Sequence, residues 1–159
     1  MQSVYIETTI PSYLTGRRSK QQAIAADQEA TCHWWDTERK HYRLFSSIFT
    51  IDEASGGDPE AAKLRLESLD GIRELEILEG FEQLEADIIA LFRLPPKAVI
   101  DAAHLALAIL HEMDYLLTWN CTHLANAVLQ KDLIDYCGYH RLHFPIICTP
   151  RTLIELRTP

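Results

Sequence analysis

The chain has 159 residues, 47% of them hydrophobic, and this length is enough for one domain with a sizeable core. Charged residues interrupt every apolar run before it reaches the length of a membrane span, and the first residues lack the basic and apolar regions of a signal peptide. The formal net charge of −8 argues against a broad basic face that attracts nucleic acid without specificity. We therefore expect one domain over residues 1–159, in the cytoplasm and without a membrane segment.

The four cysteines are widely spaced and form no CxxC pair. In a reducing compartment they are expected to be free and largely buried thiols. Two of them have histidines nearby in sequence, but neither grouping has the second ligand pair of a standard zinc site, so structural zinc is disfavoured. The cysteines are Cys32, Cys121, Cys137 and Cys148.

Five short runs of residues predict β-strands. The first is apolar and stops at Glu7, and the fourth is followed at once by polar residues that begin with Asn120. The third alternates apolar residues with glutamate, which indicates a strand buried on one side. The predicted strands cover residues 3–6, 42–49, 73–78, 115–119 and 145–149.

Helical segments separate these strands. Asp58 and Pro59 are a strong helix start, with an N-cap aspartate and proline at the first position, and Gly138 is expected to be a C-cap. Since strands alternate with helices, we predict an α/β fold: a parallel sheet of about five strands with helices on both faces. The first predicted helix is short and begins near Pro11. The others cover residues 19–40, 51–55, 59–69, 79–92, 97–111 and 127–136, and a short terminal helix begins at Pro150.

The helix predicted at residues 97–111 is apolar on nearly every side, which is typical of a buried helix. Asp101 and His104 nevertheless lie within it, one turn apart and on the same face. A buried carboxylate needs a partner or a metal, because removing it from water alone costs a large free energy. Asp101 is therefore a candidate functional residue.

Four polar side chains follow or lie beside predicted apolar elements: Glu7, Glu53, Asp101 and Asn120. In a parallel sheet they could meet at the carboxyl edge, where ligands bind. Carboxylate and amide oxygens suit a hard cation such as Mg²⁺ or Mn²⁺, which can activate water and stabilise charge on a phosphoryl group. From spacing alone, unrelated caps and salt-bridge partners explain the same residues equally well.

Three segments, in order along the chain, resemble the PIN-domain family, close to the VapC-like toxin ribonucleases. The first runs from Val4 to Ile10, and the second is Ile51-Asp52-Glu53-Ala54. The third runs from Asp101-Ala102-Ala103-His104 to Leu117-Thr118-Trp119-Asn120, and Ile147-Cys148-Thr149-Pro150 is similar to the last PIN strand. Each motif is short, but their ordered combination is specific and spans essentially the whole chain.

The resemblance implies a three-layer sandwich and a Mg²⁺- or Mn²⁺-dependent endoribonuclease of a toxin–antitoxin pair. It implies Glu7, Glu53 and Asp101 as carboxylate ligands, with Asn120 at the fourth position. It also implies an RNA substrate, a cognate antitoxin protein and a homodimer. The first acid of the family is usually aspartate and the fourth position is commonly acidic. Glu7 and Asn120 depart from this pattern, so we expect one well-held metal and a second that arrives with substrate.

Neighbouring residues are candidates for substrate binding. Thr8 is suited either to hydrogen-bond a phosphate or metal-bound water, or to cap the following helix. Thr118 points near the metal in the similar proteins, although a strand threonine often only packs. His104 is expected to orient Asp101 or contact substrate, with a core histidine as the alternative. Arg17 and Arg18 are the best basic candidates for substrate phosphates, although such clusters are usually solvated loops.

Two other functions are also consistent with the sequence. A catalytically weak or inactive PIN-like module would bind a protein partner or nucleic acid, for example through an acidic groove that receives a basic segment. Hydrolysis of DNA or another phosphoester would use the same metal chemistry and differ only in substrate. Trp34 and Trp35 are expected to pack in the core or at a dimer interface rather than stack on a base.

Overall fold

The computed structural model describes residues 1–155, in which five parallel strands form one sheet in the order β3-β2-β1-β4-β5. The central strand β1 is buried at every residue, as expected for a parallel strand that is covered on both faces. The predicted fold class, an α/β sandwich of three layers with a five-stranded parallel sheet, is confirmed. The strands are β1 (Ser3–Ile6), β2 (Arg43–Ser47), β3 (Arg73–Leu75), β4 (Tyr115–Leu117) and β5 (Ile146–Cys148).

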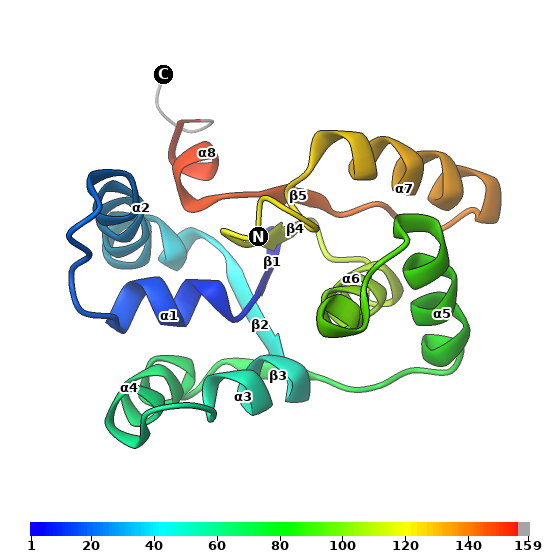
Figure 1. Ribbon diagram of the computed structural model, residues 1–159. Helices are drawn as coiled ribbons and strands as arrows, with labels where there is room; N and C mark the ends of the chain where they lie inside the picture. Colours follow the sequence, from blue (N-terminus) through cyan, green and yellow to red (C-terminus); the bar gives the residue numbers. More distant parts are fainter. Residues whose placement is uncertain (156–159) are drawn as a thin grey trace.

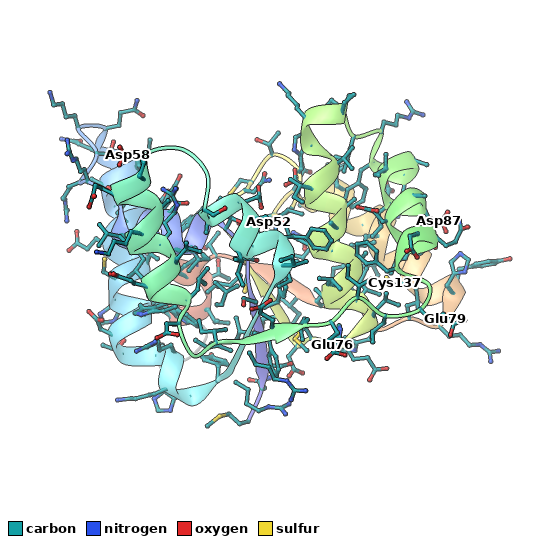
Figure 2. The ribbon with its side chains drawn as sticks, turned by 90° about the horizontal axis from the view of Figure 1, so that it is seen from below. Asp52, Asp58, Glu76, Glu79, Asp87 and Cys137 are labelled. Atoms are coloured by element: carbon teal, nitrogen blue, oxygen red, sulfur yellow. The ribbon has the colours of Figure 1, made fainter. Side chains whose placement is uncertain are left out.

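Two groups of helices cover the two faces of this sheet (Figure 1). One face carries α1 (Thr9–Thr15), α2 (Gln22–His33) with a π turn (Trp34–Glu38) and a 3₁₀ turn (Arg39–His41), α4 (Pro59–Leu69) and α8 (Pro150–Glu155). The other carries α5 (Phe81–Phe92), a 3₁₀ turn (Pro96–Ala98), α6 (Val99–Leu110) and α7 (Ala127–His140). The short helix α3 (Ile48–Ala54) follows β2 directly, and Figure 2 shows α4 on one side of the sheet and α5 and α6 on the other.

Alternation along β1 divides the core into two clusters. Val4 and Ile6 pack with α1, α4 and α8, whereas Tyr5 packs with α5, α6 and α7. Trp34 and Trp35 are buried in the first cluster, so the prediction that they pack in the core is confirmed. Tyr5 is the β1 side chain that reaches toward α6, and this position matters for the site below.

The strand register brings the polar residues to one edge. Ile6 pairs with Leu117, and Tyr5 pairs with Phe45, so β1, β2 and β4 end at the same edge of the sheet. The chain moves from β1 to β2 on one side, and β4 lies on the other side of β1. Glu7 therefore follows the strand at which the sheet order reverses, the place where open α/β sheets bind ligands.

Local sequence signals explain most element boundaries. Asp58 accepts a hydrogen bond from the backbone N–H of Ala61 at 2.9 Å, and α4 covers the predicted residues 59–69. The strand predicted at residues 42–49 is shorter because Ser47 caps α3, its side chain accepting from the backbone N–H of Thr50. The C-cap prediction for Gly138 is wrong, since α7 continues to His140 and ends at Arg141, which takes the left-handed conformation with φ 56°.

Helix α6 is the most apolar helix near the site, yet it spans only 12 residues. Within residues 1–155, no helix combines the length and the apolar character needed to cross a membrane.

Candidate metal centre

Glu7 occupies the centre of the site. It lies immediately after β1, and its backbone N–H donates to Leu117 O at 3.1 Å, which continues the pairing with β4. Its Oε2 atom accepts from Thr9 N at 3.0 Å, Thr9 Oγ1 at 2.5 Å and Thr118 Oγ1 at 2.7 Å. The other carboxylate oxygen accepts no hydrogen bond from residues 1–155. Glu7 is 3% exposed, and these bonds fix the orientation of its carboxylate while one oxygen remains free for a ligand.

Glu53 faces Glu7 from α3. Its Oε1 atom accepts from Thr8 Oγ1 at 2.6 Å and lies 2.7 Å from Nε2 of His104. Burial raises the pKa of Glu53, but the hydrogen bonds from His104 and Thr8 and the charge of His104 outweigh burial and leave the pKa lowered. Glu53 is therefore a carboxylate at neutral pH, with Oε2 outside these hydrogen bonds.

His104 is fully buried on α6 and uses both ring nitrogens. Nδ1 lies 2.7 Å from the Tyr5 hydroxyl, and Nε2 lies against Glu53. Burial lowers the pKa of His104. The electrostatic interaction with Tyr5, the hydrogen bond to Glu53, the charge of Glu7 and the hydrogen bond to Tyr5 outweigh burial and raise this pKa to about 10. The raised pKa favours the imidazolium form, in which Nδ1 donates to Tyr5 and Nε2 donates to Glu53. Tyr5 in turn lies 2.6 Å from Ser47 Oγ, so the chain of contacts continues to the cap of α3.

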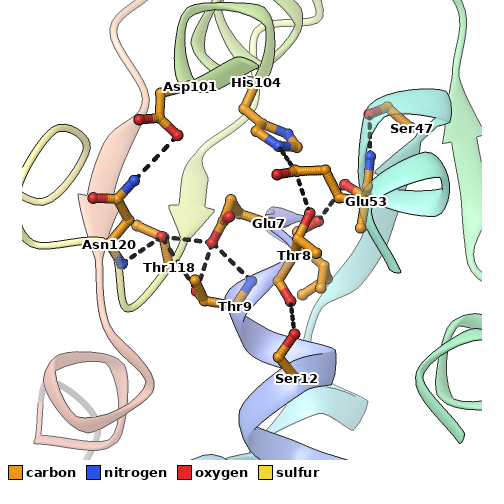
Figure 3. Close-up of polar contacts among 12 residues, drawn as sticks. Glu7, Thr8, Thr9, Ser12, Ser47, Glu53, Asp101, His104, Thr118 and Asn120 are labelled. Atoms are coloured by element: carbon orange, nitrogen blue, oxygen red, sulfur yellow. Dashed lines mark hydrogen bonds and ion pairs between the residues drawn. The ribbon is translucent and has the colours of Figure 1, made fainter. Parts of the chain in front are cut away.

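Asp101 lies one turn before His104 and is paired with the segment after β4. Its Oδ1 accepts from Asn120 Nδ2 at 3.1 Å, and its Oδ2 lies 2.9 Å from His123 Nδ1. The Asn120 amide oxygen accepts from the backbone N–H of His123 at 3.1 Å. In Figure 3, Asp101 and Asn120 lie on one side of Glu7, and Glu53 and His104 lie on the other.

The structure brings together three potential ligand groups most closely. One atom from each of Glu7, Glu53 and His104 lies within 4.8 Å of the others. Two ligand oxygens on opposite sides of a Mg²⁺ ion are about 4.2 Å apart, so groups that lie within 4.8 Å of one another are close enough to share one ion. Because both ring nitrogens of His104 already have hydrogen-bond partners, the carboxylates of Glu7 and Glu53 are the better ligands for a hard cation. His104 then serves to position Glu53.

The charge balance of the site also fits a cation. Glu7, Glu53 and Asp101 contribute three carboxylates, and no lysine or arginine in residues 1–155 forms an ion pair with any of them. His104 supplies one positive charge. A divalent cation would compensate the remaining negative charge with oxygen ligands that it prefers. The predictions that Asp101 and Asn120 are metal ligands stay predictions, since their side chains bond to each other and to His123.

Two threonines predicted to bind substrate make contacts within the site. Thr8 precedes α1 but its side chain does not cap that helix; it donates to Glu53. Thr118 is fully buried, donates to Glu7 and accepts from the backbone N–H of Asn120 at 2.9 Å. Both hydroxyls therefore hold carboxylates in place, and their contact with a substrate stays a prediction.

Arg17 and Arg18 lie beyond the far end of α1 from Glu7. Seven helical residues separate them from the site, a length of about 10 Å. Arg18 pairs with Glu29 at 3.1 Å, and the backbone oxygen of Arg17 accepts from Gln28. The structure thus places this basic pair apart from the carboxylate cluster, and a role in holding RNA stays a prediction.

Two residues that sequence reasoning did not select complete the site. Thr9 donates to Glu7 through both its backbone and its hydroxyl, and its hydroxyl also accepts from the backbone N–H of Trp119 at 2.8 Å. Tyr5 positions His104 from within the sheet. Thr9 carries a sequence signal, two residues after a strand-end acid, whereas nothing in the pattern around Tyr5 indicates its role.

Comparisons with known proteins identify no relative: no protein-family model matches the chain, and no curated protein matches its sequence.

Proposed function

We propose that this protein is a divalent-metal-dependent endoribonuclease that hydrolyses RNA phosphodiesters with Mg²⁺ or Mn²⁺. The observation that carries the proposal is the approach of Glu7, Glu53 and His104 to within 4.8 Å at the carboxyl edge of the sheet. The resemblance to PIN-domain ribonucleases supports RNA as the substrate. An RNA substrate is consistent with the cytoplasm as the compartment.

The protein's own residues divide the work of the proposed reaction. Glu7 and Glu53 would hold the cation. Asp101 and Asn120 lie on the side of Glu7 that faces away from Glu53 (Figure 3). Thr9 and Thr118 fix the orientation of Glu7, and His104 with Thr8 fixes Glu53. When bound, the cation supplies activation of water and stabilisation of phosphoryl charge.

The partners of the proposed enzyme follow from the resemblance alone. A toxin ribonuclease of this type would form a homodimer and be held inactive by a cognate antitoxin protein. Co-purification with the product of a neighbouring gene, followed by measurement of the mass of the complex, tests both statements.

The proposal is tested by cleavage of a mixed-sequence single-stranded RNA in Mn²⁺ or Mg²⁺. Glu53→Gln should abolish cleavage, because it removes a charge from the site while retaining side-chain size. Asp52→Asn is the matched control: Asp52 is the exposed neighbour on α3, labelled in Figure 2, and its removal should leave cleavage intact. Cleavage that persists in EDTA or in Glu53→Gln would contradict the proposal, and DNA of the same sequence separates a ribonuclease from a general phosphodiesterase.

A binding-only module is the second candidate, and one observation favours it. Both oxygens of Asp101 already have partners within the chain, Asn120 and His123. Such a module would bind a basic peptide in the presence of EDTA and would cleave no RNA. Calorimetric titration with a lysine-rich peptide, with and without EDTA, distinguishes it from the enzyme.

A further inference from the structure

A cavity of about 300 Å³ lies along β2 and β3, beside the end of α6. Arg43 and Arg73, the first residues of β2 and β3, line it together with His111 from the end of α6. Phe45, Leu75 and Met113 supply apolar walls. Three groups that can be positively charged thus gather in one cavity, which Glu74 and Glu76 also border.

The strand register separates the side chains of the two arginines from that of Glu74. Phe45 pairs with Arg73, so their side chains share one face of the sheet, and Arg43 and Leu75 share it by alternation. Glu74 also borders the cavity, but it pairs with Ser46, so strand alternation directs its side chain to the opposite face, where it lines a separate hollow with Ile51 and Leu66. The carboxylate of Glu74 is therefore directed away from the two arginines.

The two guanidinium groups are available for a ligand. Arg43 donates from Nε to Met1 O at 3.1 Å and lies 6.0 Å from the Phe45 ring centroid, and neither Arg43 nor Arg73 forms an ion pair in the part of the chain that is described. From strand spacing and rise, their Cα atoms are roughly 8 Å apart on the diagonal, a separation that lets two long side chains converge on one anion.

A hydrogen bond to the backbone also fixes the orientation of the His111 ring beside this cavity. Its Nε2 donates to the backbone oxygen of Glu76 at 2.7 Å, which leaves Nδ1 without a partner in residues 1–155. Figure 2 shows Glu76 beside the end of α6. Three carboxylates lie nearby: Glu74 and Glu76, which line the cavity, and Asp114, which is bonded to Ser3 and whose pKa the charge of Arg43 helps to lower.

We propose that this cavity binds a nucleoside monophosphate, with Arg43, Arg73 and His111 on the phosphate and the Phe45 wall beside the base. Guanidinium groups bind phosphate oxygens in pairs and stack on flat rings. The volume is at the lower limit of small-molecule sites, which suits a mononucleotide and is too small for a folded polymer. This inference goes beyond the proposed nuclease activity and does not depend on it.

The test is calorimetric titration of the full chain with AMP in EDTA, so that metal at the carboxylate site plays no part. Arg43→Gln and Arg73→Gln should each weaken AMP binding about tenfold or more. Lys63→Gln, the same charge change at an exposed position on α4, should leave binding unchanged, and Glu76→Gln should strengthen it. Glu7→Gln should bind AMP as the wild type does, which separates this site from the proposed metal site.

Three results would overturn the assignment: no binding of AMP, binding that survives both arginine substitutions, or inorganic phosphate binding as tightly as AMP. Tighter binding of AMP than of either adenosine or phosphate, lost in the arginine variants, would support it. Circular dichroism of each variant keeps a loss of binding distinct from a loss of fold.

Discussion

The imidazole of His104 lies 2.7 Å from Glu53 although 51 residues separate them in sequence. The contact joins α6 to α3 across the carboxyl edge of the sheet. Because His104 is fully buried and Glu53 is partly exposed, the imidazolium depends on this carboxylate for much of its compensation. The pair is therefore expected to contribute to stability as well as to the orientation of Glu53.

We expect His104→Ala to lower the free energy of unfolding by about 2 kcal/mol or more, through lost packing and a lost charged hydrogen bond. A double-mutant cycle with Glu53→Gln should give a coupling energy of about 1 kcal/mol, measured by urea denaturation. Additive effects of the two substitutions would show that the pair does not couple.

Thr118→Val should weaken Mn²⁺ binding about tenfold while the fold is retained, since the hydroxyl orients Glu7 without touching a ligand itself. Isothermal titration calorimetry with Mn²⁺ measures the effect. Thr37→Val is the control, because within residues 1–155 the Thr37 hydroxyl bonds to His33 O and Glu38, in its own segment. Equal Mn²⁺ affinity in wild type and Thr118→Val would argue against Glu7 as a ligand.

Mn²⁺ at about one hundred times its dissociation constant should stabilise the protein by about 2.7 kcal/mol, and EDTA should reverse this. For a domain of this size the melting temperature should rise by roughly 5–10 °C. Glu7→Gln should remove the shift, whereas Asp135→Asn, which breaks an exposed pair with Lys131, should preserve it. Thermal scans with and without EDTA provide the measurement, and an unshifted wild-type melt would count against a metal site.

Asn120→Asp should lower the stability of the metal-free protein by about 1 kcal/mol, because it replaces the donor to Asp101 with a second carboxylate. The same change should increase the stabilisation by Mn²⁺, since a fourth acid adds a negative oxygen ligand. Denaturation in EDTA and in Mn²⁺ gives both numbers. Destabilisation in both conditions would instead assign Asn120 a structural role only.

Asp114 provides a prediction for acid pH. Its Oδ2 accepts from Ser3 N at 2.7 Å and Ser3 Oγ at 2.9 Å, and the backbone hydrogen bond from Ser3 is the main reason that the pKa of Asp114 is lowered. When the pKa of a carboxyl is lower in the folded state than in the unfolded state, the group stabilises the fold at any pH above its unfolded-state pKa. This stability is lost as the pH falls through the folded-state pKa. The difference in unfolding free energy between wild type and Asp114→Asn should therefore shrink below about pH 4. A difference that stays constant from pH 6 to pH 3 would contradict this role.

The sequence predicts the fold better than the contacts of the site. Strand and helix positions follow from local signals, such as the Asp58 cap and the buried character of α6. The partners of His104 are distant in sequence, so spacing could place it one turn from Asp101 but could not reveal Tyr5 and Glu53. The error at Gly138 has a local origin: a glycine can end a helix but need not, and here the left-handed position falls on Arg141.

The carboxylates at the site come from two halves of the chain, Glu7 and Glu53 before β3 and Asp101 after it. An ion shared among them would act as a reversible cross-link between the β1–α3 region and α6. With the ion bound, both halves would exchange their amide hydrogens more slowly. This protection from exchange would extend to strands that do not contact the ion.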